Sequence, residues 1–559
     1  MFNDATAARG VTRREALRLG VMGAIAAGLG AACQSAPAAP PAAQKPTSAP
    51  APAVSAKSDS PAALATAAPA PTAAPAVAKP ATATGKVVLM TGGDPPNLDA
   101  QTDSNNATRI VVFDNVIESL VTYDNDLKLT PGLATSWERM GETKTRFKLR
   151  QGVKFHNGEV FNAGAVVFAV KRMNDPANNA SVLSFLDTID KAEAVDDYTV
   201  DVITKGPDPI LPRRITFLGF LAPKATEADP KSAADKPIGT GPYQVTEWTK
   251  GQRILLTAFD GYWGDAKPTI KEVEYRPRKE SSVRMTALKA GEAHLIENIS
   301  PEDAATLPKE QVLTKYSLEC MFLRPNAKAG VTADKRVRLA MSYAIDRPSI
   351  VKQIMGGFAN EPNGQLYVPS TFGYDTTMKD HPYDLEKAKA LIKEAGAEGK
   401  PLTIIGNSAN RWLKDREVQE ALGNMIGKAG LKVDFKLIEQ AEWLKAGREV
   451  QNPPMDVWFS SAGNDLVDPD RILFAYVKTG GRLSLFSNPE TDKLLDASRA
   501  ELDNGKREGI LKQVAKIVQD EAAMLPVAQQ NWIYGISPKL KFTVLANGQL
   551  PANRMTLQA

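Results

Sequence analysis

The sequence has few of the residues that metal centres and disulfides require. Its 559 residues include two cysteines and three histidines. The histidines, His156, His294 and His381, are scattered along the chain, and no pair of cysteines or histidines has the spacing of a zinc site or a metalloprotease. We therefore predict no metal site and no cofactor. We also predict no disulfide in the folded part, because Cys320 is the only cysteine after position 33.

Catalytic motifs are missing as well. The sequence contains neither the Gly-x-Ser-x-Gly turn of serine hydrolases nor a phosphate-binding loop. A secreted hydrolase is the enzyme alternative, and no residue pattern supports it. We predict that the protein is not an enzyme.

Charge is nearly balanced, and the apolar stretch near the start of the chain is too short to cross a membrane. Lys and Arg total 68 and Asp and Glu 64, a net charge of +4 that falls to +2 once residues 1–32 are removed. This balance argues against a nucleic-acid partner, which calls for a clustered basic face. The uncharged residues 19–32 number fourteen, fewer than the roughly 20 that a spanning helix needs.

The first 33 residues are typical of an export signal. Four arginines between positions 9 and 18 precede the apolar residues 19–32. The adjacent arginines in residues 12–18 resemble a twin-arginine signal, with Ala16 where that pattern prefers a bulky apolar residue. A disordered basic tail is the alternative.

A cysteine ends this apolar stretch. The small residues 30–32 before Cys33 resemble the cleavage box of bacterial lipoproteins, although Leu29 lies four places before the cysteine and not the preferred three. We predict a lipid anchor at Cys33; a free or buried cysteine is the alternative.

Residues 34–85 are predicted to be a disordered tether. They contain 21 Ala and 11 Pro among 52 positions, with almost no charge. Such a segment buries too little surface to offset the entropy of ordering, so we expect it to be extended and partly polyproline-like.

The remaining 474 residues, 86–559, exceed the size at which a single core stops growing, so we expect at least two lobes. Short β-branched or aromatic runs alternate with amphipathic stretches, which indicates an α/β architecture. Residues 507–522 and 337–354 repeat apolar side chains at helical spacing, and a third helix begins after Asn162 as its N-cap. Residues 432–438 alternate with period two, as in a strand.

Several segments resemble, in the same order, those of the peptide-, nickel- and oligosaccharide-binding family of solute-binding proteins of ABC importers. The resemblance covers essentially all of residues 86–559. The segments are PGLATSW (131–137), FKLRQGVKFHNG (147–158), GTGPY (239–243), YWG (262–264), ALKAGE (287–292) and RVRLAMSYAIDR (336–347).

The resemblance implies a two-lobed fold like that of periplasmic binding proteins, with a hinge and a discontinuous first lobe. Lobe I would comprise residues 86–322 and 530–559, with an inserted subdomain at about 126–231, and lobe II residues 323–529. The hinge crossings would lie near residues 324–326 and near Pro526.

We interpret most of the shared segments as scaffold. Gly239 and Gly241 suit a tight turn that needs unusual φ angles, and His156 is expected to be a hydrogen-bonded structural residue. Core packing accounts for the helix at residues 337–354 without a ligand.

The loop at residues 462–469 carries the main candidate for ligand binding. The resemblance implies a role for the aspartate that lies three residues before an acidic residue followed by proline. In peptide-binding members of the family, this aspartate binds the amino group of the ligand. That residue is Asp465 here, with Asn464 beside it. A buried carboxylate suits an ammonium group because it makes charge-assisted hydrogen bonds. The alternative is that Asp465 only caps or turns the loop.

One departure weakens the peptide interpretation, because peptide binders often have Trp where this chain has Ala462. Trp412 and Trp443 are alternative aromatic surfaces, and Arg411 could hold a carboxylate with two hydrogen bonds. Packing in the core or at its rim is the competing interpretation for each.

The loop at residues 99–106 resembles a segment that lines the ligand cleft. Our candidate ligand contact in this loop is the residue at position 102, which is Thr102. The nearest carboxylate in the sequence is that of Asp103. The competing interpretation is that these polar residues cap helices.

The functional prediction is an extracytoplasmic protein, in the periplasm or at the cell surface, that captures a small hydrophilic solute for an ABC importer. We favour a short peptide because of Asp465. The expected partners are this solute, an ABC permease with its ATPase subunits, and the membrane through Cys33, with the protein a monomer. The alternatives are an oligosaccharide or a metal chelate as solute, or a ligand sensor that signals to a membrane receptor.

Overall fold

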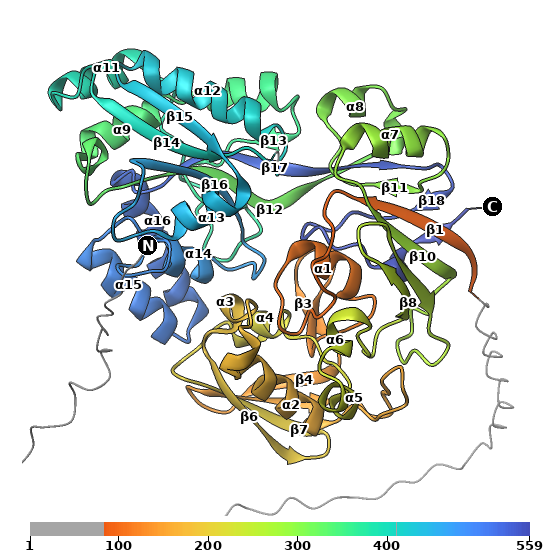
Figure 1. Ribbon diagram of the computed structural model, residues 1–559. Coiled ribbons are helices and arrows are strands. Elements are labelled where there is room, and N and C mark those ends of the chain that lie inside the picture. Colours follow the sequence, from red (N-terminus) through yellow and green to blue (C-terminus); the bar gives the residue numbers. More distant parts are fainter. Residues whose placement is uncertain (1–82, 410, 559) are drawn as a thin grey trace, which may run out of the picture. The chain divides into compact units, whose positions relative to one another are not determined.

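The structure is a computed structural model that describes residues 83–409 and 411–558 (Figure 1). The predicted signal, Cys33 and all but the last residues of the predicted tether lie outside the described residues. Within these ranges, no helix has both the length and the apolar character that crossing a membrane requires.

Eleven strands form one mixed sheet. Ten of them follow the order β15-β14-β16-β12-β17-β11-β1-β10-β9-β8, and β13 pairs with β17. The strands are β1 (Thr84–Thr91), β8 (Tyr243–Thr249), β9 (Arg253–Ala258), β10 (Ile270–Pro277), β11 (Leu295–Ile296), β12 (Val312–Pro325), β13 (Ala359–Asn360), β14 (Pro401–Asn407), β15 (Lys432–Ile438), β16 (Val457–Gly463) and β17 (Leu525–Ile536).

A separate antiparallel sheet has the order β4-β5-β7-β6, and two pairs of short strands, β2-β3 and β18-β19, form outside both sheets. Its core spans residues 120–222 and also takes in Leu466 from far along the chain. The strands are β4 (Ala134–Arg139), β5 (Lys144–Leu149), β6 (Ile189–Asp196) and β7 (Thr199–Thr204), with the pairs β2 (Val121–Tyr123) and β3 (Leu129–Pro131), and β18 (Leu540–Lys541) and β19 (Thr556–Leu557).

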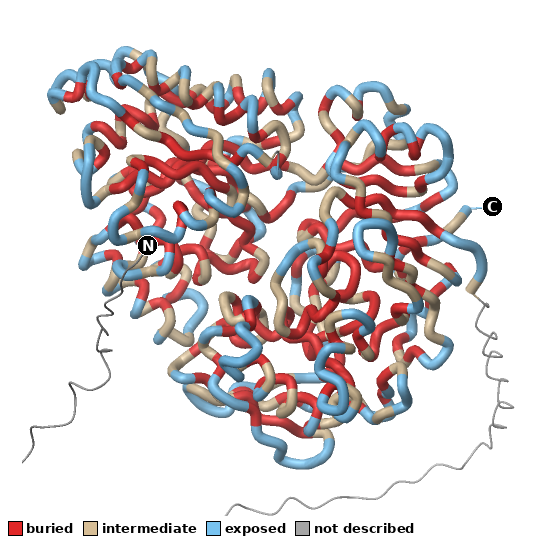
Figure 2. The backbone as a smooth tube through the Cα atoms, in the orientation of Figure 1, coloured by how far each residue is buried: buried red, intermediate tan, exposed pale blue. Residues whose placement is uncertain are grey.

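Helices pack against both sheets, and the buried parts of the chain follow the strands and the inner faces of these helices (Figure 2). The helices are α1 (Asn106–Val112), α2 (Ala163–Asn174), α3 (Leu183–Leu186), α4 (Leu211–Ile215), α5 (Pro223–Ala228), α6 (Ser232–Asp235), α7 (Ser281–Lys289), α8 (Pro301–Ala305), α9 (Lys335–Ala344), α10 (Arg347–Ser349), α11 (Leu385–Glu394), α12 (Asp415–Lys428), α13 (Gln440–Arg448), α14 (Asp470–Tyr476), α15 (Pro489–Ala500) and α16 (Asn504–Asp520).

Two long strands connect the lobes. β12 and β17 pair along most of their length and run from one lobe to the other (Figure 1). Their register shifts between Tyr316 and Cys320, which is where the core of the first lobe gives way to that of the second. The crossing therefore lies a few residues before residues 324–326, because Arg324 is fully buried in the second lobe and donates to the carbonyls of Leu483 and Gly447. The predicted lobe boundaries stay a proposal.

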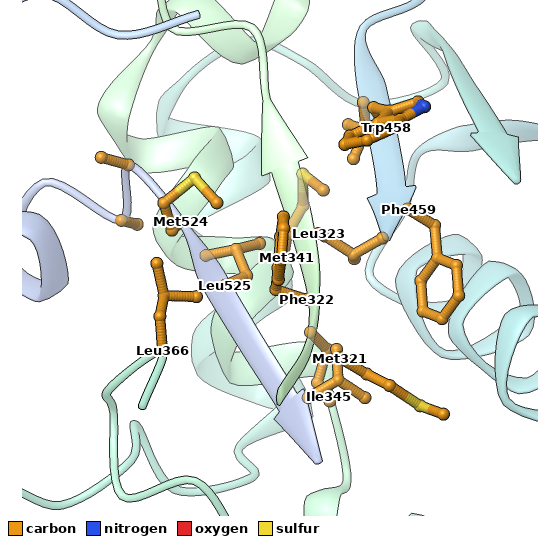
Figure 3. Close-up of a cluster of buried hydrophobic side chains, with 14 of the residues drawn as sticks. Met321, Phe322, Leu323, Met341, Ile345, Leu366, Trp458, Phe459, Met524 and Leu525 are labelled. Atoms are coloured by element: carbon orange, nitrogen blue, oxygen red, sulfur yellow. The ribbon is translucent and has the colours of Figure 1, made fainter. Parts of the chain in front are cut away.

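The second lobe has the largest hydrophobic core. It is built on the middle of the sheet, where Phe322 and Leu323 of β12 lie beside Leu525 of β17 and Phe459 of β16 (Figure 3). Cys320 of β12 is buried with a free thiol.

Two of the elements expected from periodicity form as predicted. Residues 504–520 are helix α16, with Leu511, Val514 and Val518 buried, and residues 432–438 are strand β15 with alternating exposure. Asn162 stands at the N-cap of α2, but its side chain makes no capping hydrogen bond with the described residues.

The helix predicted at residues 337–354 is broken. α9 ends at Ala344, and Asp346 then caps a new turn by accepting from the backbone N–H of Ser349 at 3.0 Å. Pro348 lies in the first turn of this new helix, where its missing N–H costs nothing, whereas it would break a continuous one. Arg338 of α9 is buried; it donates to the carbonyl oxygens of Thr332 and Ala333 and forms an ion pair with Glu521 at 3.4 Å.

The GTGPY segment is scaffold, but for a different reason than predicted. Neither Gly239 nor Gly241 has a positive φ. A Cβ at Gly239 would instead lie 1.9 Å from the carbonyl oxygen of Val116, so close backbone approach requires glycine. His156 holds the same segment: its Nδ1 accepts from the N–H of Gly239 at 3.3 Å, and its Nε2 lies 3.0 Å from the carbonyl oxygen of Gly241. The prediction of a hydrogen-bonded structural histidine is confirmed.

Candidate ligand-binding site

A cavity of about 480 Å³ is lined by residues of both lobes. Its volume falls within the usual range for small-molecule sites, about 300–1,000 Å³. One side is formed by α1 with Phe113 and Asp114, and the other by the end of β16 with α14. The lining is mainly polar and charged, with six arginines and four carboxylates: Arg109, Arg411, Arg448, Arg471, Arg482, Arg554, Asp114, Asp124, Glu319 and Asp465.

The loop after β16 presents Asp465 to this cavity. The backbone N–H of Val467 closes the turn on the carbonyl of Asn464 at 2.7 Å, with Val467 at a φ of 52°. Leu466 is buried against the core of the small sheet, and the hydroxyl of Tyr123 donates to its carbonyl at 3.0 Å. Because its neighbours are fixed, the loop holds Asp465 in place while leaving the carboxylate about one third exposed, at 35%.

Asp465 is only loosely paired within the protein. Its nearest cation is Arg471, whose Nη2 lies 3.8 Å from Oδ2, beyond hydrogen-bonding distance. Arg471 donates instead to the carbonyl of Gly463 at 2.5 Å. The carboxylate of Asp465 is therefore free to receive a donor from a ligand.

Besides Asp465, three carboxylates line the cavity: Asp114, Asp124 and Glu319. Burial raises the pKa of Glu319, and the nearby charge of Asp465 raises it further, while Arg411 lowers it. Burial also raises the pKa of Asp114, against the lowering effect of Arg554 and Arg109. Asp114 has a φ of 63°, a strained conformation of the kind that concentrates at functional sites.

Arg109 is a buried cation at the cavity wall. Its guanidinium lies between two aromatic rings, with Cζ 3.9 Å from the centroid of Phe113 and 4.1 Å from that of Phe217. Burial lowers its pKa to about 10, although the charges of Asp114 and Asp465 oppose this shift. Its Nη1 is buried without a hydrogen-bond partner among the described residues.

Three more arginines gather on the opposite lobe. Arg448 ends α13, Arg471 lies in α14, and Arg482 follows α14. Arg482 is exposed but lines the cavity, where partial desolvation lowers its pKa, and the like charges of Arg471 and Arg448 lower it further. The Nε of Arg471 is buried with no partner in the part of the chain that the structure describes.

The structure separates the predicted site residues into two groups. Asp465 and Arg411 line the cavity. Asn464 does not: it is buried and donates from Nδ2 to the carbonyl of Leu366 at 3.1 Å. Thr102 donates to Asp99 at 2.8 Å and lies outside the lining, although Ser104 two residues later contributes to it.

Both candidate tryptophans lie in the hydrophobic core of the second lobe. Trp412 packs edge-on against Trp443, with ring centroids 5.7 Å apart. Trp443 stacks on Trp458 at 4.6 Å and donates from Nε1 to the carbonyl of Phe459 at 3.0 Å. Neither lines the cavity, so the packing interpretation accounts for both.

The sequence interpretation missed Glu319, Asp114 and every lining arginine except Arg411. Arg109 and Arg471 each lie in a short helix, where a charged residue ordinarily indicates a solvated face. Nothing in their local sequence marks them as facing a cavity. Within the described residues, no group of His, Cys, Asp and Glu is arranged to hold a metal ion.

Comparison with known proteins identifies the family. The model for bacterial extracellular solute-binding proteins, family 5, matches residues 128–483. The glutathione-binding protein GsiB of Pectobacterium atrosepticum is 26% identical over 467 residues, covering 81% of this chain and 90% of that protein. The dipeptide-binding protein of Escherichia coli is 28% identical over 502 residues, covering 81% and 91%.

Solved structures show the same fold. The periplasmic binding protein DppA of Helicobacter pylori, in complex with the peptide STSA, superposes with a TM-score of 0.74 at 24% identity, covering 85% of this chain and 98% of that one. The substrate-binding protein CtaP of Listeria monocytogenes superposes with a TM-score of 0.76 at 23% identity, covering 85% and 100%. The chain therefore belongs to the bacterial extracellular solute-binding proteins, family 5: it is the extracytoplasmic solute-binding component of an ABC importer, not an enzyme.

Proposed function

We propose that the solute is a short peptide whose amino group binds at Asp465. The observation that carries this proposal is a fixed, partly exposed carboxylate on the wall of a cavity between the lobes, whose nearest cation, Arg471, lies 3.8 Å away and beyond hydrogen-bonding distance. Relatives described as glutathione-binding and dipeptide-binding proteins support the choice of a peptide.

Glu319 strengthens the ammonium site. Burial raises the pKa of Glu319, and the negative charge of Asp465 raises it further because like charges repel. A bound ammonium group would relieve this repulsion and would form charge-assisted hydrogen bonds, which are about twice as strong as neutral ones. Closure of the lobes around the peptide would exclude water and strengthen these contacts.

The proposal predicts that Asp465→Asn lowers the affinity for the dipeptide Ala-Gln by about tenfold to a hundredfold, because the amide removes the charge but keeps the shape. Calorimetric titration of the full chain with Ala-Gln and with its N-acetyl derivative measures this. The acetylated peptide, which has no ammonium group, should bind weakly to both proteins.

Asp434→Asn is the matched control, since Asp434 is an exposed carboxylate on β15 that pairs with Lys436. Its affinity for Ala-Gln should equal that of the wild type. Equal affinity of the wild type and Asp465→Asn would exclude the amine contact.

We also propose that the protein is exported with a twin-arginine-like signal and anchored through Cys33, with residues 34–85 as a tether, and that it acts as a monomer on its permease. The small residues 30–32, which directly precede Cys33 at the end of an apolar stretch, support the anchor. Metabolic labelling with a fatty acid should mark the wild-type protein and not Cys33→Ala. Equal labelling of the two would place any lipid elsewhere.

A further inference from the structure

The cavity holds more positive charge than its own carboxylates neutralise. Six arginines face four carboxylates, and two of these, Asp114 and Glu319, are the ones whose ionised form burial disfavours. Among the described residues, no carboxylate lies within ion-pair distance of Arg109, Arg448 or Arg482.

Two other arginines that the chain buries deeply are paired with carboxylates, whereas Arg324 has no carboxylate partner among the described residues and its buried Nε lacks an acceptor. Arg507, with a side chain 2% exposed, makes two hydrogen bonds to Asp468, at 2.6 and 2.8 Å. Arg214, 1% exposed, contacts three carboxylates. Arg109 is 6% exposed and has only the faces of two aromatic rings, with a buried N–H that lacks an acceptor. An orphaned donor of this kind on a cavity wall indicates an acceptor supplied by the ligand.

The arginines of the second lobe form another group, and of the three only Arg471 has a carboxylate within 4 Å, that of Asp465 at 3.8 Å. The like charges of Arg471 and Arg448 are close enough to Arg482 to lower its pKa. A bound anion would offset the repulsion between these like charges. Guanidinium groups also bind carboxylates with two parallel hydrogen bonds.

Asp465 lies within the field of both groups. The charge of Asp465 raises the pKa of Arg109, against the effect of burial, and Oδ2 of Asp465 lies 3.8 Å from Nη2 of Arg471. An ammonium group at Asp465 would therefore sit between two positions that favour anions.

We propose that the preferred solute is a multiply anionic peptide, with one carboxylate at Arg109, another at Arg448 and Arg482, and its amino group at Asp465. This inference rests on the proposed peptide-binding function and narrows it to acidic peptides. The same arginines would also favour a polycarboxylate that lacks an amino group, so the experiment includes one.

Titration of the full chain with Ala-Glu and Ala-Gln tests the inference, because the two dipeptides are nearly identical in shape and differ by one charge. Ala-Glu should bind at least about tenfold more tightly. In Arg482→Gln this preference should fall to about twofold or less, because the variant removes one arginine from the group that receives the second carboxylate. Arg109→Gln should weaken both dipeptides, since it removes the other anion position.

Arg416→Gln is the control. Arg416 is an exposed arginine of α12 that pairs with Glu420, and its removal should leave the preference for Ala-Glu unchanged. Arg482 is also exposed, so loss of the folded state is not expected there. If Arg109→Gln fails to fold, the preference of Arg482→Gln for Ala-Glu over Ala-Gln still tests the inference.

Equal affinities for Ala-Glu and Ala-Gln in the wild type would overturn the inference and leave the peptide proposal intact. Binding of the polycarboxylate tricarballylate but of neither dipeptide would support the anion sites and overturn the peptide proposal. Failure of all three compounds to bind would overturn both.

Discussion

Replacing Arg214 by methionine is expected to lower the free energy of unfolding by about 3–5 kcal/mol. The Nη2 of Arg214 lies 2.5 Å from Asp470 and its Nε 2.9 Å from Asp208, and all three side chains are 1% exposed. Removing the cation leaves two buried carboxylates without their main partner, which costs more than the ion pair contributes. Urea denaturation of the full chain measures the change.

This network joins two distant parts of the chain, α4 beside the small sheet and α14 beside the cavity. Arg499 also pairs with Asp470, at 2.7 Å, and these two arginines hold the pKa of Asp470 well below its ordinary value of 3.8 despite burial. A depressed pKa contributes stability at pH above 3.8, and this contribution is lost as the pH falls below that value. Acid should therefore destabilise the wild type more than Arg214→Met.

Arg336→Met is the control for this experiment. Arg336 pairs with Asp334 at 2.6 Å, but its side chain is 48% exposed, so the loss should stay within about 1 kcal/mol. Equal effects of Arg214→Met and Arg336→Met would show that the buried network does not stabilise the fold as described.

The second large effect is expected at Trp443. Trp443→Ala should lower the free energy of unfolding by about 3–5 kcal/mol, because it leaves a cavity in the second lobe and removes the hydrogen bond to Phe459. The Trp443 ring stacks on Trp458 and packs edge-on against Trp412, so the substitution also removes packing contacts from these two side chains.

Calorimetry separates this structural role from ligand binding. At a temperature where Trp443→Ala is folded, its affinity for Ala-Gln should match that of the wild type, because Trp443 does not line the cavity. Tyr383→Ala is the control for stability, since Tyr383 is 47% exposed. A large loss of affinity with little loss of stability would restore Trp443 as a ligand platform.

Periodicity predicted the regular elements best where one face is buried. α16 and β15 form where their apolar repeats indicated, since the pattern itself decides which face enters the core. The helix at residues 337–354 shows the limit of the method. Its apolar repeat continues across Asp346 and Pro348, but the capping hydrogen bond of Asp346 and the ring of Pro348 outweigh that repeat.

The candidate site could be predicted only where a segment resembles the family. The loop after strand β16 resembles that of peptide-binding members, and this resemblance pointed to Asp465, which lines the cavity. The position of Arg109 on the cavity wall could not be predicted, because its guanidinium packs on the ring of Phe217, which lies 108 positions away in the sequence. A tryptophan can form a ligand surface or part of a core, and the local sequence does not distinguish the two. Contacts with residues distant in the sequence place Trp412 and Trp443 in the core.

A crystal structure of the full chain with bound Ala-Glu tests most directly the claim that the solute is held between the lobes at Asp465. The account predicts that the peptide fills the cavity between Arg109 and Arg482, with its amino nitrogen within hydrogen-bonding distance of the Asp465 carboxylate. A peptide bound outside this cavity, or bound inside it with the amino group away from Asp465, would contradict the account.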